Sequence, residues 1–276
     1  MSTTNLTTLL TRRRSTVKVA PVTQATVVRS EWIKLRSVRS TLAVLALTFV
    51  VGILLGIVVA YIVRTHWTSL SHDWHDPRNL VTRSVLGVIL AQLTVGALGV
   101  LFVTGEYTSG MMRATLGAVP RRLPVLWAKA GVYGVVALTL SLATAFVGFF
   151  ASQAIMGSHG VSLGYPGALR AVFGVALYLT VVGLLGVALG FLMRSTAGGI
   201  TALFTVLLIV PPLVDNLPWS FHKAIEPYLP SDAGQAVYAM QHSAKALHPW
   251  PGFLLFCGYT ALAFAAAAIA LRRRDA

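Results

Sequence analysis

The sequence contains little charge and almost no cysteine. Only 11% of its 276 residues are Asp, Glu, Lys or Arg, whereas 56% are hydrophobic; in a soluble domain about a quarter of the residues are charged. The single cysteine, Cys257, excludes an intramolecular disulfide framework and a metal site built from cysteines. Together with a mean hydropathy of +0.75, this composition predicts an all-α integral membrane protein with about six spans.

Three further absences narrow the function. The apolar stretches contain no Asp, Glu, Lys or His, whereas ion-coupled carriers commonly bind their driving ion through ionisable groups at membrane depth. The phosphate-loop pattern GxxxxGK(S/T) is missing, so we expect no ATP hydrolysis by this chain. No Ser, His and Asp are grouped within the apolar stretches, which disfavours an intramembrane hydrolase. We therefore predict no catalytic, cofactor-binding or metal-binding residue.

Six apolar stretches are long enough to cross a membrane as helices. We expect glycines on one face of the first and fourth spans to let other helices approach closely. The tandem proline Pro211-Pro212 should kink the fifth span or end it before the full membrane thickness. The predicted spans are 41–63, 84–104, 130–156, 170–193, 200–214 and 252–271, and the packing glycines are Gly52, Gly56, Gly183, Gly186 and Gly190.

The segments outside the spans differ in character. Residues 1–23 are polar and basic, which is typical of a disordered tail near anionic headgroups. Residues 24–39 predict an amphipathic interfacial helix with Val28, Trp32, Leu35 and Val38 on one side, although Glu31 interrupts the apolar arc. The residues of this helix singled out as functional are Trp32, Lys34, Leu35 and Arg36.

Two outer segments carry polar and aromatic residues. Residues 64–83 include His72-Asp73-Trp74-His75-Asp76, which could bind a divalent metal. No helical register holds these side chains on one face, and Asp76-Pro77 indicates a turn, so a solvated loop is the preferred interpretation. Residues 215–251 mix aromatic, apolar and charged residues, which predicts short helices that dip into the outer leaflet.

The distribution of charge predicts the orientation. With the amino terminus in the cytoplasm, 16 of the 22 Lys and Arg residues lie on the cytoplasmic side and 6 lie outside. This asymmetry is the positive-inside rule, so the net charge of +14 indicates membrane orientation and not a nucleic-acid partner.

The chain is organised around the loop 105–129 between the second and third spans. Thr108 or Ser109 could cap a short helix there, and Met112, Leu116 and Val119 would form its apolar face. Pro120 would end this helix, because proline lacks the N–H needed to continue it. On these features alone, the loop could be an ordinary basic anchor.

Three segments together resemble bacterial ABC-2 type permeases. They are Glu106-Tyr107-x-x-Gly110-Met111-x-Arg113-x-Thr115-Leu116 followed by Pro120-Arg121-Arg122, then Arg29-Ser30-Glu31-Trp32-x-Lys34-Leu35-Arg36-Ser37, and finally Tyr228-Leu229-Pro230-Ser231-x-Ala233-Gly234-Gln235-Ala236. The resemblance implies an ABC-2 (type V exporter-like) architecture. In it, an elbow helix at 24–39 precedes a transmembrane domain at 40–276, with a coupling loop at 105–129 and a re-entrant segment at 215–251.

The resemblance also implies an activity and partners. Such a chain would be a multi-pass permease subunit of an ATP-driven exporter in the bacterial cytoplasmic membrane, with both termini in the cytoplasm. It would pair with a second permease, as a homodimer or heterodimer, and with two copies of an ATPase subunit that bind ATP and Mg. The residues expected to contact the ATPase are Glu106, Met111, Met112, Arg113, Thr115 and Leu116.

Other interpretations stay open at this point. Glu106 could pair with a basic residue near the start of the loop or in the elbow helix, or it could remain solvated. Arg121 and Arg122 could hold lipid phosphates. An apolar path without fixed charges suits a drug, a peptide or a lipid as cargo. The alternatives are a membrane scaffold or immunity-type protein of the same lineage, and a secondary transporter.

Overall fold

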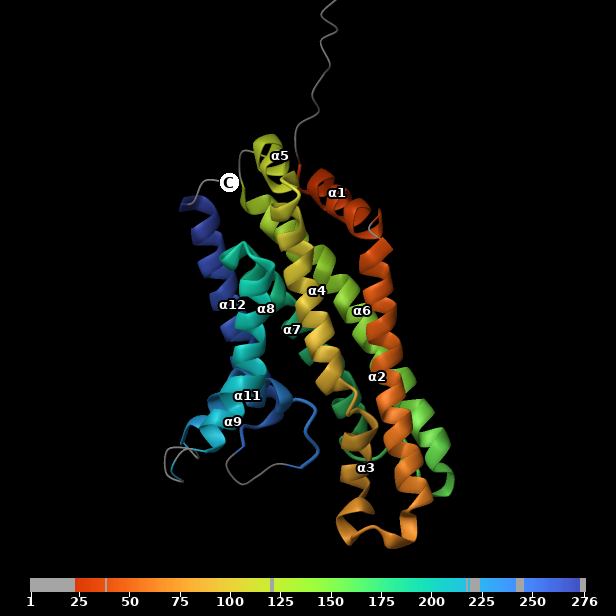
Figure 1. Cartoon of the computed structure of the whole chain (residues 1–276). Coiled ribbons are helices and arrows are strands. Elements are labelled where there is room, and N and C mark those ends of the chain that lie inside the picture. The colour runs from red at the N-terminus through yellow and green to blue at the C-terminus, as the bar shows by residue number, and fades with distance from the viewer. Residues whose placement is uncertain are drawn as a thin grey trace, which may run out of the picture.

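The computed structural model describes residues 23–37, 39–119, 122–216, 218, 224–241 and 246–273. Every regular element in these ranges is a helix (Figure 1). Among the described residues, six helical segments are long and apolar enough to cross a membrane, so the chain is a multi-pass membrane protein. The predicted tail falls almost entirely outside the described ranges.

The helices run back and forth between two ends of the molecule. The long ones are α2 (Arg39–Thr65), α4 (Val88–Thr108), α6 (Leu123–Met156), α7 (Ala168–Met193), α8 (Thr196–Phe204) with its continuation α9 (Val210–Asp215), and α12 (Pro249–Arg273). The short ones are α1 (Gln24–Ser37), η1 (Trp67–Ser69), η2 (His72–Trp74), α3 (Pro77–Ser84), α5 (Met111–Ala118), η3 (Gly157–His159), η5 (Glu226–Tyr228) and α11 (Pro230–Gln235). Figure 1 places α1 and α5 at one end, here called the α1–α5 end, and α3, α9 and α11 at the other, the α3–α11 end.

The second and third spans extend beyond their predicted bounds. The second span runs over Pro77–Thr108, and α4 is its longer part. The third span, α6, starts at Leu123 instead of residue 130. Asp76-Pro77 is not a turn but the start of α3, because the Asp76 carboxylate accepts a hydrogen bond from the Arg78 backbone N–H at 2.8 Å. Proline suits the first helical position, which needs no N–H donor. The predicted loop 64–83 is therefore largely helical.

The tandem proline does not end the fifth helical segment. This segment begins at Thr196, where the Ser195 hydroxyl accepts a hydrogen bond from Gly198. It then widens into a π-helical turn, η4 (Thr205–Ile209), and continues as α9 to Asp215. The prolines lack N–H groups and their rings crowd the carbonyls four residues earlier, within η4, and the wider turn relieves this conflict. The predicted distortion is present, but the predicted early end is wrong.

The backbones of α4 and α7 touch at the centre of the molecule. A Cβ atom added at Gly99 would collide with the carbonyl oxygen of Gly183, and one at Gly186 would collide with that of Gly96. Gly190 faces α4 as well, with 3.0 Å between such an atom and the nearest carbonyl oxygen. Only glycine allows so close an approach of two helices.

The glycines of α2 are also used inside the chain. A Cβ at Gly52 would lie 2.7 Å from the Thr144 side chain of α6, and one at Gly56 would lie 2.7 Å from the carbonyl oxygen of Ser84. These small-residue faces pack on other helices of the same chain. A second copy could not use them without displacing those helices.

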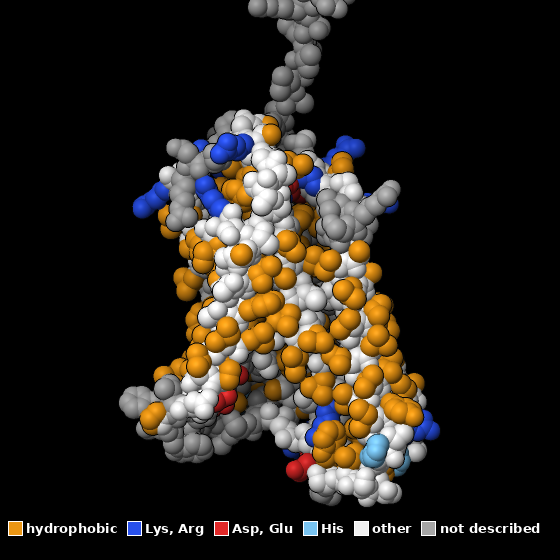
Figure 2. All heavy atoms as spheres, in the orientation of Figure 1, with side chains coloured by type: hydrophobic (Ala, Val, Ile, Leu, Met, Phe, Trp, Pro, Cys, Tyr) orange, Lys and Arg blue, Asp and Glu red, His pale blue; other side chains and the backbone are white. Residues whose placement is uncertain are grey.

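The exterior has the pattern of a membrane protein. Figure 2 shows hydrophobic side chains over the middle of the visible face, with most of the visible Lys and Arg side chains at the α1–α5 end. Asp, Glu and His are seen mainly at the opposite end. An apolar belt between two polar ends matches a bilayer, which is about 30 Å thick in its hydrocarbon part.

Candidate functional site

The candidate site lies at the α1–α5 end, and α5 is its outermost element. The predicted cap of this helix is wrong: α5 begins at Met111, and the hydroxyls of Thr108 and Ser109 instead donate to the Gly105 carbonyl at 3.0 and 2.9 Å. Gly110 makes the turn from α4 into α5 with a φ of 72°, a conformation that glycine adopts without strain. Only two residues therefore lie between the end of α4 and the start of α5.

The apolar side of α5 faces the rest of the chain. Met112 is only 1% exposed and Leu116 is also buried, both in a cluster that includes Val27 of α1 and Leu126 of α6. The expectation that this face inserts into a partner does not fit this arrangement, because it is already covered. The outer side of α5 presents Met111, Arg113, Ala114 and Gly117, all of which are exposed.

The buried face of α1 also differs from the sequence prediction. Val27, Glu31 and Leu35 are buried, whereas Val28 and Trp32 are exposed. Val38 lies outside the described residues. Glu31, which interrupts the apolar arc in the sequence, is fully buried. The apolar side chains of α1 thus lie on two faces of this helix, one turned toward the protein and one turned away from it.

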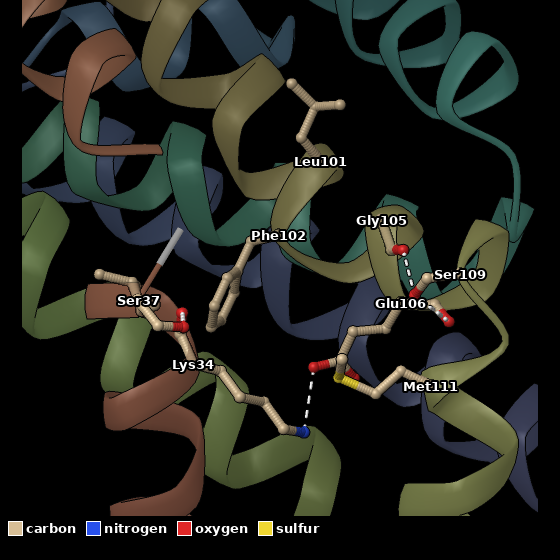
Figure 3. Close-up of a pocket in the computed structure, with 9 residues that line it drawn as sticks. Lys34, Ser37, Leu101, Phe102, Gly105, Glu106, Ser109 and Met111 are labelled. Atoms are coloured by element: carbon tan, nitrogen blue, oxygen red, sulfur yellow. Dashed lines mark hydrogen bonds and ion pairs between the residues drawn. The ribbon is translucent and has the colours of Figure 1, made fainter. Parts of the chain in front are cut away.

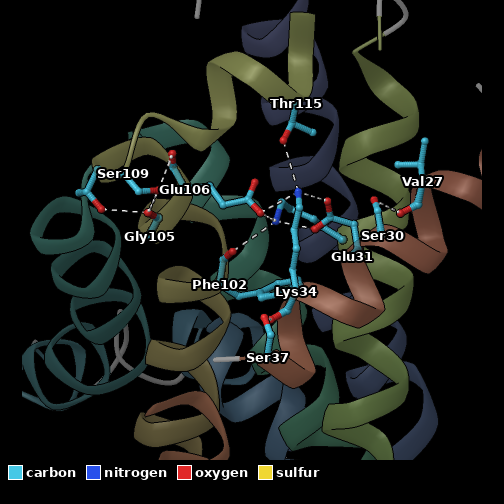
Figure 4. Close-up of polar contacts among 12 residues, drawn as sticks. Val27, Ser30, Glu31, Lys34, Ser37, Phe102, Gly105, Glu106, Ser109 and Thr115 are labelled. Atoms are coloured by element: carbon cyan, nitrogen blue, oxygen red, sulfur yellow. Dashed lines mark hydrogen bonds and ion pairs between the residues drawn. The ribbon is translucent and has the colours of Figure 1, made fainter. Parts of the chain in front are cut away.

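Four charged side chains explain why Glu31 is buried. The Lys129 Nζ of α6 lies 2.7 Å from Glu31 Oε2 and 2.9 Å from Glu106 Oε1 at the end of α4. The Lys34 Nζ lies 2.7 Å from Glu31 Oε1 and 3.0 Å from Glu106 Oε1 (Figure 4). We call these four residues the charge cluster. The alternative in which Glu106 pairs with the N-terminal helix is therefore confirmed.

The charge cluster is largely buried and carries no net charge. Lys129 and Glu31 are fully buried, and the two carboxylates match the two ammonium groups. Burial acts to lower the pKa of Lys34, but the hydrogen bonds and charges of Glu31 and Glu106 outweigh it, so this pKa is raised above its ordinary value. Removing one member would leave an opposite charge buried without compensation.

The charge cluster also reaches α5 and lies near the ends of the helices. Lys34 Nζ is 3.3 Å from the Thr115 hydroxyl of α5, so Thr115 faces the cluster and not a partner. Glu106 is two residues from the end of α4, and Lys129 is about 9 Å along α6 from its start. The four charges therefore join α1, α4, α5 and α6 close to one membrane surface.

A cavity of about 260 Å³ opens beside the charge cluster. Figure 3 shows Leu101 and Phe102 of α4 on one side, with Lys34 and Ser37 of α1 facing them. The Lys129 ammonium also lies 4.4 Å from the centre of the Phe102 ring, close enough for a cation–π contact. The cavity thus combines an apolar wall with the exposed edge of the ion pairs.

The basic turn after α5 is partly described. Arg122 Nη1 donates to the Leu271 carbonyl oxygen at the end of α12, at 3.2 Å. Arg121 lies outside the described residues, so its expected contact with lipid phosphate stays a prediction. For Arg122, the contact with α12 gives the guanidinium a role within the chain.

The α3–α11 end is built differently. The Arg170 guanidinium of α7 donates to the backbone carbonyls of Val237 and Ala239 at 2.7 and 3.0 Å, which holds the segment after α11 against α7. Burial raises the pKa of Asp232 on α11 to about 6, while a hydrogen bond from Ser231 opposes the shift. This end therefore contains an acid whose charge changes near neutral pH.

The histidines at the same end pack on tryptophan. The rings of His75 and His159 lie 4.3 and 3.9 Å from the Trp67 ring, and His75 Nε2 is 2.8 Å from the Trp67 carbonyl oxygen. Within the described residues, no group of three His, Cys, Asp or Glu side chains could hold a metal ion. Of the residues for which the sequence left metal binding open, His75 thus packs on Trp67 and contacts its backbone carbonyl.

The pairing of Glu31 with Lys129 was missed from the sequence. These residues are 98 positions apart, and the available signal was weak: an acid on the apolar side of one helix and a lysine at the edge of an apolar stretch. No family model and no curated protein sequence matches this chain.

Proposed function

We propose that the chain is the permease subunit of an ATP-driven exporter of the ABC-2 type, and that a separate partner chain binds ATP and Mg. The observation that carries this proposal is α5, a short helix fixed between two spans with one side packed inward and the other side exposed. A partner that pushes on the exposed side would move a structured element. An ordinary basic loop would not transmit such a push.

The charge cluster supports a role for α5 in coupling. Lys34 contacts Thr115 of α5, Glu31 of α1 and Glu106 of α4. A displacement of α5 would therefore act on α1 and α4 through ion pairs, and on the spans that follow them. Under this proposal, Glu106, Thr115, Met112 and Leu116 transmit the motion from inside the permease.

The proposed contact with the ATPase is the outer side of α5. Met111, Arg113 and Gly117 are exposed there, and Arg113 would meet an acidic edge of the partner's groove. This moves the contact away from the apolar stripe that the sequence suggests. The stripe instead holds α5 on the permease.

The remaining architecture is consistent with the same proposal. α1 would be the elbow helix in the cytoplasmic interface, with the exposed Trp32 at headgroup level, and the segment from α9 to α11 would be the outer re-entrant part. Both termini would be cytoplasmic, in a bacterial plasma membrane. A second permease would pack on surfaces other than the glycine faces of α2 and α7. The cargo would be hydrophobic or amphipathic: a drug, a peptide or a lipid.

The test uses variants on the outer side of α5. A Cβ at Gly117 would meet no atom within 4 Å, so Gly117→Trp should leave the permease folded and obstruct the partner. Arg113→Glu should add charge repulsion, and Gly258→Trp at another open glycine on α12 is the matched control. The measurement is the ATPase retained by affinity-tagged permease, together with ATP-dependent efflux and the amount of permease in the membrane.

The expected result is at least a tenfold loss of retained ATPase for Gly117→Trp and Arg113→Glu, which corresponds to about 1.4 kcal/mol or more. Gly258→Trp should behave like the unaltered chain. Retention of both the ATPase and efflux by Gly117→Trp would contradict the proposed docking face. Transport that follows an ion gradient without ATP would instead favour a secondary transporter.

A further inference from the structure

A second groove lies on the side of α1 turned away from the charge cluster. It has a volume of about 520 Å³, within the usual range for small-molecule sites. Its walls come from two helices that are far apart in the sequence: Ala25, Val28, Arg29 and Trp32 of α1, and Gly131, Val132 and Val135 of α6. In Figure 1, α1 lies at the end of the molecule from which α6 descends.

The floor of the groove is open because of a glycine. A Cβ atom at Gly131 would meet nothing within 4 Å, and the neighbouring Val132 is buried beneath. Val135, one turn further along α6, is 61% exposed. Gly131 and Val135 lie about 12 and 18 Å along α6 from its start. The groove therefore runs from α1 into the membrane-spanning part of α6.

The charge at the rim of the groove has one sign. Arg29 is exposed and lines the groove, and no acidic residue lies among the lining residues. Trp32 is 44% exposed beside it. These features follow the order of groups in an anionic lipid. The cation would contact the headgroup, the amphipathic tryptophan would lie at the interface, and the apolar channel along the span would contact the acyl chain.

We propose that this groove binds one anionic phospholipid, with the phosphate on Arg29 and an acyl chain between Trp32 and Val135. The charge of Arg29 complements the phosphate, and the apolar side chains of Val28, Trp32 and Val135 complement an acyl chain. The site is independent of the transport function proposed above. It would be occupied whether or not an ATPase docks on α5.

The bound lipid would fix the position of α1. One face of α1 carries Glu31 and Lys34 into the charge cluster, and the groove is on another face of the same helix. Filling the groove would hold α1 against α6 and keep the ion pairs closed. Gln24 strengthens the same contact, because its Nε2 donates to the Pro124 carbonyl at 3.2 Å.

The experiment measures lipid binding to the full chain. The delipidated protein in detergent is titrated with phosphatidylglycerol or with phosphatidylcholine, and bound lipid is counted by native mass spectrometry. Arg29→Gln removes the charge, and Gly131→Leu fills the floor of the groove. Arg36→Gln, an exposed arginine outside the groove, and Gly258→Leu, an equally open glycine on α12, are the matched controls.

The expected result is one tightly bound phosphatidylglycerol and weaker binding of phosphatidylcholine. Arg29→Gln should weaken phosphatidylglycerol binding about fivefold, Gly131→Leu should weaken it at least tenfold, and neither control should change it. Equal binding of the two lipids, or equal binding by all four variants, would mean ordinary boundary lipid and would overturn the proposal. In the unaltered chain, a photoactivatable phosphatidylglycerol should crosslink to α1 or α6. Crosslinks found only on other helices would overturn the proposal, whatever the variants show.

Discussion

The two ends of the molecule give their cations different kinds of partner. At the α1–α5 end, the lysines of the charge cluster are paired with carboxylates from other helices. At the α3–α11 end, Arg170 donates to two backbone carbonyls, and Arg64 donates to the Ile155 carbonyl at 2.6 Å. Arg83 at the same end lies 3.4 Å from the centre of the Trp74 ring.

This difference predicts different responses to change. An ion pair needs two particular side chains, so a single substitution leaves the opposite charge buried and unpaired. A backbone carbonyl is present whatever residue occupies the position, so only loss of the arginine itself breaks the contact. We therefore expect the α1–α5 end to be sensitive to any change in charge and the α3–α11 end to be sensitive at few positions.

The largest expected effect comes from breaking the charge cluster. Lys129→Met removes one of the two ammonium groups that lie 2.7 Å from Glu31 and leaves one carboxylate charge of the cluster uncompensated, which should lower the free energy of unfolding by about 3–5 kcal/mol. The double variant Glu31→Gln with Lys129→Met removes both charges and should cost less than Lys129→Met alone. Equilibrium unfolding in mixed micelles measures the free energy of unfolding of Lys129→Met, Glu31→Gln and the double variant. If the costs of the two single variants add up to the cost of the double variant, Glu31 and Lys129 are not coupled.

A smaller effect is expected from the inner face of α5. Met112 is buried, so Met112→Ala should cost about 2–5 kcal/mol through lost burial and the cavity left behind. Met111 is 46% exposed, and Met111→Ala should change the free energy of unfolding by about 0.5 kcal/mol or less. The same unfolding measurement compares them. Similar costs for the two would mean that α5 does not pack as described.

The α3–α11 end should respond locally to loss of Arg170. Arg170→Met removes the two hydrogen bonds that the guanidinium donates to the segment after α11. Hydrogen exchange of peptides covering 230–241 should become faster, while exchange in α1 and α5 stays unchanged. Arg64→Met, at another carbonyl contact of the same end, should leave 230–241 protected. Faster exchange throughout the molecule would contradict a local role.

The smallest expected effect is a difference in pH response. Because burial raises the pKa of Asp232 from 3.8 to about 6, the folded state binds this proton more tightly than the unfolded state. The stabilisation is therefore present at low pH and is lost as pH rises through about 6. The raised pKa of Lys34 has its effect only at alkaline pH, where stability falls as Lys34 loses its proton.

Hydrogen exchange between pH 5 and 7, corrected for intrinsic rates, separates these responses. The region 230–241 should be better protected at pH 5, the α1–α5 end should not change, and Asp232→Asn should abolish the difference. A pH response of 230–241 that survives Asp232→Asn would have another source.

The helical class and the number of spans could be predicted because each apolar stretch must satisfy its backbone internally in a membrane. The span bounds were less accurate, because the predicted second span stops before Glu106 and the predicted third span starts after Lys129. Glu106 and Lys129 lie inside α4 and α6, where their mutual pairing makes burial possible. Such pairing joins residues distant in sequence, and helical periodicity carries no information about it.

The orientation of the amphipathic helices was harder to predict for a related reason. An apolar stripe indicates that something covers it, but lipid, a partner and the same chain all provide apolar surface. Met112 and Leu116 are covered by this chain, whereas Val28 and Trp32 are not. Composition distinguishes these cases poorly, because both stripes contain large apolar residues of similar size.

The contact between α4 and α7 has a mechanical consequence. Where backbones touch at Gly99 and Gly186, one helix cannot slide past the other by a residue, because the next side chains would meet a carbonyl group. We therefore expect α4 and α7 to move together, and α5 is attached to the end of α4 through Gly110. A tilt imposed on α4 at the α1–α5 end would then also tilt α7 and displace both helices at the far side of the membrane.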